Sequence, residues 1–248
     1  MFVTYFQKIK ELMDVVEQQE KKALGLASER LIRCIENNGV IHVFGCGHSH
    51  LLGEELFYRA GGLVPISPIL IEDLMLHKGA ARSSALEKRN HYAQTFMESV
   101  NIRPQDVMIV VSTSGRNPVP IDVALIAKEK RTFVIGITST EYAKHQKSRH
   151  LSGKFLYEVC DLVIDTHIPV GDALIEHEED FSFGPASTVI GTAIVNGLAA
   201  ETAHQMIQRG VAPPLFKSGN IDGSADHNEA FIRKYKERIP LLEGTKPF

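Results

Sequence analysis

The sequence predicts an α/β protein with three layers, in which a five-stranded parallel sheet lies between two layers of helices. Short apolar runs alternate with amphipathic helical segments along most of the chain, which is the pattern of a parallel sheet covered on both faces. Two of these runs end abruptly in loops rich in glycine and hydroxyl side chains. The 248 residues are enough for one large domain, and no Pro/Gly/Ser-rich linker divides them.

The first segment, residues 1–36, has the periodicity of a helix. Apolar side chains recur at steps of three and four residues from Phe2 to Val16, although Gly25 could interrupt the helix. Five strands are predicted after it, at Ile41–Phe44, Leu63–Ile69, Val107–Ser112, Phe133–Thr138 and Leu162–Ile164. Helical stretches separate most of these strands, around Leu51–Arg59, Leu86–Val100 and Ile121–Lys130. This alternation favours a parallel sheet with helical crossovers.

The last third of the chain has a different pattern. After Asp165, a polar connection is expected to form a loop, and Thr188–Gln208 then forms a long helix of small and apolar side chains. A helix that is apolar on most faces is buried, either inside the domain or against a second subunit, and we favour a homo-oligomer, a dimer or a tetramer. In the tail, residues 220–248, an amphipathic helix is expected from about Asn228, with Asp226 or Asn228 as its N-cap.

The run Val107–Pro118, VMIVVSTSGRNP, predicts a buried strand, a turn full of hydrogen-bond donors and a helix start. A helix N-terminus carries unpaired backbone N–H groups and partial positive charge, so a turn of this kind suits an anion. Hydroxyl donors, a close backbone approach at Gly115 and a charged guanidinium would add to it. We interpret the turn as a phosphate-binding loop whose candidate ligands are Ser112, Thr113, Ser114, Arg116 and Asn117.

A second loop has the same construction. Val40–Ser49, VIHVFGCGHS, is again a short apolar strand that runs into a glycine-bracketed loop, with Gly47, His48 and Ser49 as candidate ligands. Neither loop fits a nucleotide motif. The loop after residue 44 lacks the third glycine of the dinucleotide fingerprint, and no GK[ST] follows either loop. An ordinary strand-to-helix turn is the alternative. Ligands of parallel sheets lie beyond the carboxyl ends of the strands, so both loops could face one pocket.

The segments FGCGHSH at Phe44–His50 and VSTSGRNP at Val111–Pro118 together resemble the sugar isomerase (SIS) domain family, over about Leu31–Ala212. Its members include phosphoheptose isomerase, the isomerase half of glucosamine-6-phosphate synthase and N-acetylmuramic acid 6-phosphate etherase; SGRNP is especially similar to the etherase and to the glucokinase regulatory protein. The pattern along the whole chain also resembles bacterial proteins described only as sugar isomerase domain-containing. The resemblance implies a single flavodoxin-like SIS domain. It also implies that the hydroxyls of residues 112–114 hold the phosphate of a sugar, joined by Ser49.

Isomerisation between an aldose and a ketose needs a base, usually a carboxylate or histidine. In phosphoheptose isomerase and the etherase, a glutamate lies ten residues after the serine that corresponds to Ser49. Here that position is Arg59, and Glu55 is placed to pair with it on a helix. Glu72 falls roughly where the synthase-like members carry a glutamate. Glu87 is another candidate, although it could instead be the capping-box partner of a serine at 83 or 84. His204, three residues after a glutamate on the long helix, is the third.

Composition limits the partners and the location. The net charge of −3 and the pI near 6.4 favour neither nucleic acid nor a membrane surface. With three cysteines, no long apolar span and an amphipathic, charged N-terminal stretch, we expect a cytoplasmic protein without metal or other cofactor. Only some forty residues precede the first strand, which argues against a DNA-binding unit. We therefore expect a sugar-phosphate isomerase or related proton-transfer enzyme; the alternatives are a non-catalytic phosphosugar sensor and an etherase-like lyase.

Overall fold

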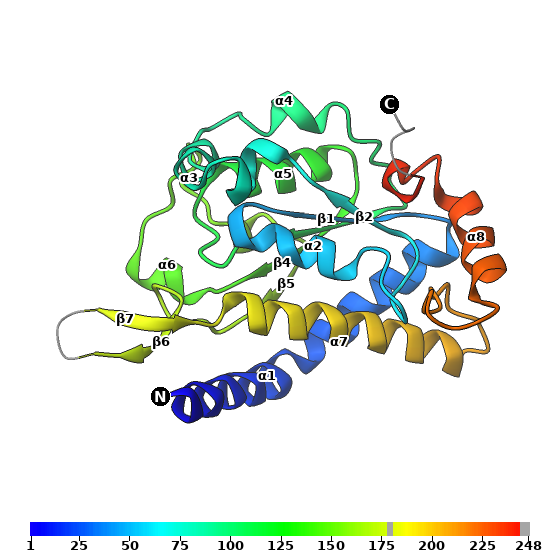
Figure 1. Ribbon diagram of the computed structural model, residues 1–248. Coiled ribbons are helices and arrows are strands. Elements are labelled where there is room, and N and C mark those ends of the chain that lie inside the picture. The colour runs from blue at the N-terminus through cyan, green and yellow to red at the C-terminus, as the bar shows by residue number, and fades with distance from the viewer. Residues whose placement is uncertain (178–180, 244–248) are drawn as a thin grey trace.

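The computed structural model describes residues 1–177 and 181–243 and confirms the three-layer α/β fold. Its central sheet is parallel and has the strand order β2-β1-β3-β4-β5 (Figure 1). The strands are β1 Ile41–Gly45, β2 Ile66–Ile69, β3 Val107–Val111, β4 Phe133–Thr138 and β5 Leu162–Asp165. All five predicted strands are present. The second is shorter than expected, because Leu63 makes only an isolated bridge to Leu215, and Pro65 has no N–H to extend the ladder.

The register of the two central strands positions the functional loops. Within the β1–β3 pair, Ile41 lies opposite Val107 and Gly45 lies opposite Val111, so the two strands end at the same level. Adjacent parallel strands that end together release their following loops at the same edge of the sheet. The loop after β1 and the loop after β3 are therefore neighbours.

Both faces of the sheet are covered by helices, and the strand side chains alternate between them. Ile109 and Val111 pack with one layer, whereas Met108 and Val110 pack with the other. The first layer consists of α1 Phe2–Glu36, α2 Leu51–Leu56 and α7 Ser187–Gln208. The second consists of α3 Ala80–Glu87, α4 Gln94–Met97 and α5 Pro118–Glu129. Near-continuous apolar strands such as VMIVV are the consequence of burial on both sides.

Helix α1 is continuous from Phe2 to Glu36 and lies beside α7 on the same face of the sheet (Figure 1). Gly25 does not interrupt it. A glycine costs a helix only about 1 kcal/mol, and the apolar face of α1 is buried on both sides of this position, at Val16 and at Leu31.

The C-terminal helix α8, Ser224–Tyr235, starts earlier than expected. The residue before it, Gly223, has φ of 79°, a left-handed conformation that starts the helix without a side-chain cap. Asp226 and Asn228 therefore lie inside the helix, and the prediction of either as N-cap was wrong. The Asn228 side chain instead bonds to the backbone of Lys217, at 2.9 Å for both of its hydrogen bonds.

Two other predictions from the sequence were wrong. The expected loop after β5 contains an antiparallel hairpin, β6 Ala173–Glu176 and β7 Ser182–Pro185. The expected helix over 86–100 is broken, because α3 ends at Glu87 and only α4 follows. At the break His91 adopts φ of 64° and donates its backbone N–H to the Asp122 carboxylate at 2.9 Å, a tertiary bond that local propensity does not reveal.

The remaining short helix, α6 Glu141–His145, follows β4. Across the described parts of the chain, no helix combines the length and apolar character needed to cross a lipid bilayer.

Candidate functional site

The loop after β1 turns sharply at its two glycines. A Cβ on Gly45 would lie 2.5 Å from the carbonyl carbon of Ser49, so a side chain at residue 45 would force the loop open. Gly47 has φ of 55° and begins a 3₁₀ turn over Gly47–His50 that leads directly into α2. This tight path keeps Ser49 half-buried beside the sheet edge, whereas the His48 side chain is exposed.

The loop after β3 is held by its own backbone and by β4. Ser112 is buried, with only 5% of its surface exposed, and its Oγ accepts the N–H of Gly115 at 3.3 Å. Gly115 has φ of 57°, and a Cβ there would lie 2.6 Å from Oγ1 of Thr138. The backbone of Thr113 accepts the N–H of Ser139 at 2.9 Å. These contacts fix the loop, while Thr113 and Ser114 stay half-exposed.

The two loops meet at a small crevice. It has a volume of about 10 Å³ and is lined by Ser49 from the first loop and Thr113 from the second, with the start of α7 as its third wall. A crevice of this size holds no more than a water-sized group, so a phosphate would lie over its mouth. Within residues 1–177 and 181–243, the hydroxyls of Ser49, Thr113 and Ser114 donate no hydrogen bond. They are free to donate to an oxyanion.

The helix that follows the second loop contributes less than its position suggests. Residues Pro118 and Pro120 occupy its first turn and have no N–H to offer, so Val119 is the only one of its first three residues with an N–H donor. The expectation that the N-terminus of α5 supplies several backbone donors therefore needs correction. The hydrogen-bond donors at this turn are mainly hydroxyl side chains and loop N–H groups.

Two residues of α7 complete the crevice and were missed from the sequence. Ser187 and Thr188, in the first turn of α7, line it together with the two loops. The long helix itself was predicted, and hydroxyl side chains at its start are a weak signal, because serine and threonine are common at helix N-termini for capping alone. Only the tertiary fold brings them to the carboxyl ends of β1 and β3.

Arg116 and Asn117 connect the second loop to the segment after α6. The Arg116 guanidinium donates to the carbonyl oxygen of Lys147 at 2.9 Å and to Oε1 of Gln146 at 2.8 Å. Burial, with a further contribution from the positive charge of Arg149, lowers the pKa of Arg116. Asn117 Oδ1 accepts a hydrogen bond from Arg149 at 3.0 Å. Arg116 thus braces the loop, and Arg149 is a cation near the site that the sequence did not indicate.

Among the three candidate bases, Glu87 is the one that the fold brings to the loops. It is the last residue of α3, so the alternative role as the capping-box partner of a serine at 83 or 84 was wrong. Burial raises the pKa of its carboxyl, and the Asn117 side chain, which faces the carboxyl, partly opposes this. Burial raises the pKa of the Cys46 thiol in the first loop, and the nearby charge of Glu87 adds to the shift. The Glu87 carboxyl therefore lies close to Asn117 of the loop after β3 and near Cys46 of the loop after β1.

The other two candidates have exposed side chains. The Glu72 side chain is 70% exposed and pairs with Lys78 at 2.9 Å, and this bond lowers the pKa of its carboxyl. His204 is exposed on α7, where its Nε2 and Nε2 of Gln208 are 2.8 Å apart. Glu55 accepts a hydrogen bond from Arg59 at 3.0 Å, which confirms the predicted pair.

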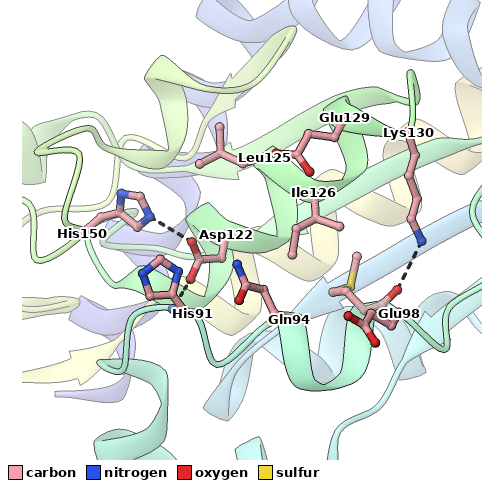
Figure 2. A pocket seen from close by; sticks show the side chains of 10 residues that line it. His91, Gln94, Glu98, Asp122, Leu125, Ile126, Glu129, Lys130 and His150 are labelled. Carbon is pink, nitrogen blue, oxygen red and sulfur yellow. Dashed lines mark hydrogen bonds and ion pairs between the residues drawn. The ribbon is translucent and has the colours of Figure 1, made fainter.

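A larger cavity, of about 440 Å³, lies on the outer side of α5 (Figure 2). At one end, Asp122 accepts hydrogen bonds from the backbone of His91 at 2.9 Å and from His150 at 3.0 Å. At the other end, the Lys130 ammonium group donates to the backbone carbonyls of Met97 and Val100 at 3.3 and 3.2 Å. Asp122, His150 and Lys130 are thus held by hydrogen bonds within the chain. The Asp122–His150 pair also fastens the segment that carries Arg149.

Comparison with known proteins agrees with this fold. The model of the SIS domain matches residues 4–139. A UPF0309 protein of Halalkalibacterium halodurans is 55% identical over 98% of this chain and 97% of its own length. A phosphoheptose isomerase from Francisella tularensis has the same fold at 16% identity, with a TM-score of 0.53 over 81% of this chain and 95% of that one. The sugar isomerase domain of an RpiR transcription factor from Sphaerobacter thermophilus has a TM-score of 0.50 at 17% identity, over 96% and 98% of the two chains. The chain belongs to the SIS domain family and, within it, to the UPF0309 proteins.

Proposed function

We propose that this protein binds a phosphorylated sugar with its phosphate over the two loops and interconverts aldose and ketose forms by proton transfer. The observation that carries the proposal is the gathering of free hydroxyl donors from the β1 and β3 loops at one crevice, with the half-buried Glu87 carboxyl near both loops. The fold is shared with a phosphoheptose isomerase, which agrees with this reaction class.

The phosphate end of the ligand is the better defined part of the site. Hydroxyls of Ser49, Ser112, Thr113 and Ser114 would donate to the phosphate oxygens, and each bond to a charged oxygen is worth about 1.5–3 kcal/mol. The free N–H groups of the second loop add to them. Gly47, His48, Arg116 and Asn117 are the remaining residues of the proposed binding surface, with Arg116 acting through the shape of the loop.

The proton transfer assigns a role to Glu87. Isomerisation removes a proton from the carbon next to the carbonyl while the carbonyl oxygen gains one, which gives an enediol. A proton then returns to the former carbonyl carbon as the hydroxyl on the other carbon loses its own. A base for this step works best when its pKa lies closer to neutral than that of a free carboxyl, and burial shifts Glu87 in that direction. Glu72, which is held by Lys78, and His204 have exposed side chains and are weaker candidates.

Calorimetric titration with glucosamine 6-phosphate and fructose 6-phosphate tests the binding site. The double substitution Ser112→Ala and Ser114→Ala should weaken binding at least about 100-fold, since two bonds to a charged group are lost. Ser99→Ala is the matched control, because this hydroxyl is exposed and bonds only to the carbonyl of Phe96. Equal affinities for the double variant and the wild type would remove the assignment.

Catalysis is tested separately by NMR in deuterated water. We expect the C2 proton of a bound substrate to exchange with solvent, and Glu87→Gln to slow the exchange by about 10²–10⁴-fold while the phosphate still binds. Phosphosugars that saturate the protein without any exchange would rule out the isomerase.

Arg59 favours a second candidate function, a phosphosugar sensor without turnover. The related isomerases carry a glutamate at this position, whereas here an exposed arginine pairs with Glu55. The same residue argues against an etherase-like lyase, for which release of lactate from N-acetylmuramic acid 6-phosphate is the direct assay. Binding without proton exchange and without lactate release would identify the sensor.

We further propose that the protein is a homodimer that pairs through α1 and α7. An apolar cavity of about 300 Å³ lies between these helices, lined by Met13, Val16, Leu24, Ile190, Ala193 and Gly197 among others. Phe2 and Phe6 on α1 and Ile207 on α7 are exposed by 74%, 57% and 60%. Exposed apolar surface that is shared by two adjacent helices is typical of a subunit interface, and a second copy of this chain is the proposed occupant.

A further inference from the structure

The start of α7 differs chemically from the two loops that it meets. Ser187, its first residue, lines the crevice opposite Ser49 and Thr113. Its surroundings include Asp172, which comes from the other end of the β6–β7 hairpin. The Asp172 carboxylate closes the base of this hairpin by bonding to the beginning of the helix.

Asp172 makes three hydrogen bonds there. Its Oδ1 accepts the backbone N–H groups of Ala186 at 3.1 Å and of Ser187 at 2.8 Å. Its Oδ2 accepts the hydroxyl of Ser187 at 2.5 Å. The carboxylate therefore already compensates the positive end of α7, so this helix is a poor site for the phosphate itself.

The bond between the two side chains has a fixed direction. An ionised carboxylate only accepts hydrogen bonds, and a serine hydroxyl has a single hydrogen to give. The hydrogen of Ser187 is thus directed to Asp172, and the oxygen keeps only lone pairs for other partners. At Ser49 and Thr113, by contrast, the hydroxyl hydrogens have no acceptor among the described residues. Ser187 therefore offers an acceptor to the crevice, whereas Ser49 and Thr113 have hydrogens to donate.

We propose that Ser187 is a specificity-determining residue that accepts a hydrogen bond from a hydroxyl of the ligand, and that Asp172 fixes this polarity. The ligand class is a phosphate monoester with a free hydroxyl on the carbon next to the one that bears the phosphate. The phosphate and the hydroxyl of the ligand must be close together, because a crevice of only about 10 Å³ separates Ser187 from Ser49 and Thr113. This inference rests on the proposed phosphate site and adds the selection of its substrates.

The substitution Asp172→Asn reverses the direction of the hydrogen bond between the side chains of residues 172 and 187, while the side chain at residue 172 keeps nearly the same shape. The new amide oxygen can still accept both backbone N–H groups, whereas the new amide nitrogen donates to the Ser187 oxygen and releases the hydroxyl hydrogen toward the crevice. The substitution also removes a negative charge one hydrogen bond away from the crevice. Ser187→Ala, in turn, removes the acceptor and leaves both backbone bonds to Asp172 in place.

The experiment measures the affinities of propyl phosphate and of propane-1,2-diol 1-phosphate, which differ by one hydroxyl, by NMR titration. The wild type should prefer the diol phosphate about tenfold, the effect of one hydrogen bond. Ser187→Ala should lose this preference without weakening propyl phosphate. Asp172→Asn should also lose it, and should bind propyl phosphate several-fold more tightly. Thermal unfolding and circular dichroism check that both variants are folded.

Two results would overturn the inference: a wild type without preference, or a Ser187→Ala variant that keeps it. An Asp172→Asn variant with both affinities unchanged would equally contradict the role of Asp172. Failure of the phosphate site is distinguishable from these outcomes, because it would appear as propyl phosphate that does not bind, or that binds equally well to the variant lacking the hydroxyls of Ser112 and Ser114.

Discussion

The hydroxyl residues of the site differ in whether another side chain accepts a hydrogen bond from them. Ser49, Thr113 and Ser114 have hydroxyl hydrogens without an acceptor in the described parts of the chain, whereas Ser187 gives its hydrogen to Asp172. A sequence shows the hydroxyl residues as equivalent and does not reveal this difference. The direction of each hydrogen bond depends on which partner the fold supplies.

Glu87 is the residue on which the proposed catalysis depends. Replacement by Gln should lower the rate of proton exchange by about 10²–10⁴-fold, the usual contribution of a general base. In the wild type, the rate should fall as the pH is lowered through the raised pKa of this carboxyl, because only the ionised form accepts a proton. In the variant this acidic limb should disappear. The measurement is a pH profile of exchange by NMR, with Glu98→Gln, an exposed glutamate, as control.

The same raised pKa predicts an effect on stability. Because the pKa of Glu87 is higher in the folded protein than its ordinary value of 4.5, the folded state binds more protons than the unfolded state between the two pKa values. The stabilising contribution of Glu87 to the free energy of unfolding is thus complete below about pH 4.5. It is lost as the pH rises through the pKa of Glu87 in the folded protein. Glu87→Gln should be more stable than wild type at pH 7, and the difference should shrink on acidification. Urea unfolding at several pH values measures it; a variant less stable than wild type at pH 7 would show that the carboxylate is net stabilised.

At the scale of elements, the five strands of the sheet could be predicted from the sequence, whereas features that depend on tertiary contacts could not. Five apolar runs gave five strands, and VMIVV followed by STSG predicted the position of the second loop. The break in the helix near His91 could not be predicted, since it depends on a bond to Asp122, 31 residues away. For the same reason, nothing local showed that the end of α3 would bring Glu87 near both loops. The β6–β7 hairpin was missed because its strands are four residues each and alternate poorly.

The central strand β3 should be the most sensitive element of the fold. Ile109 is 1% exposed and contacts the helical layer formed by α1, α2 and α7. Ile109→Ala should lower the free energy of unfolding by about 2–5 kcal/mol, because it leaves a cavity in a packed core. Leu151→Ala, at a position that is 72% exposed, should change it by less than about 0.5 kcal/mol. Urea denaturation of both variants measures the difference, and similar midpoints would place β3 outside the core.

At the scale of the whole molecule, two surfaces are proposed to bind partners. They are the crevice, for the ligand, and the apolar face of α1 and α7, for a second copy of the chain. The two helices lie side by side along one side of the sheet (Figure 1), and the exposed Ala193 lies in the middle of their shared cavity. Both surfaces begin at the first turns of α7, so pairing of two chains would leave the crevice next to the interface.

Ala193→Asp should weaken the proposed dimer at least about 100-fold, because a charge buried without a partner is costly. The substituted side chain is exposed in the single chain, so folding should be unaffected. Sedimentation velocity over a range of concentrations measures the change, with Leu151→Asp as a control on a distant exposed site. A wild-type protein that sediments as a monomer at every concentration would contradict the dimer.

The position of the ligand can be determined directly by amide chemical shifts during titration with glucosamine 6-phosphate. If the oxyanion lies where β1 and β3 pass into their helices, the largest shifts will fall on residues 47–50 and 112–117 and on the first turn of α7. Shifts centred instead on the cavity of His91, Asp122 and Lys130, with the two loops unchanged, would contradict the proposed site.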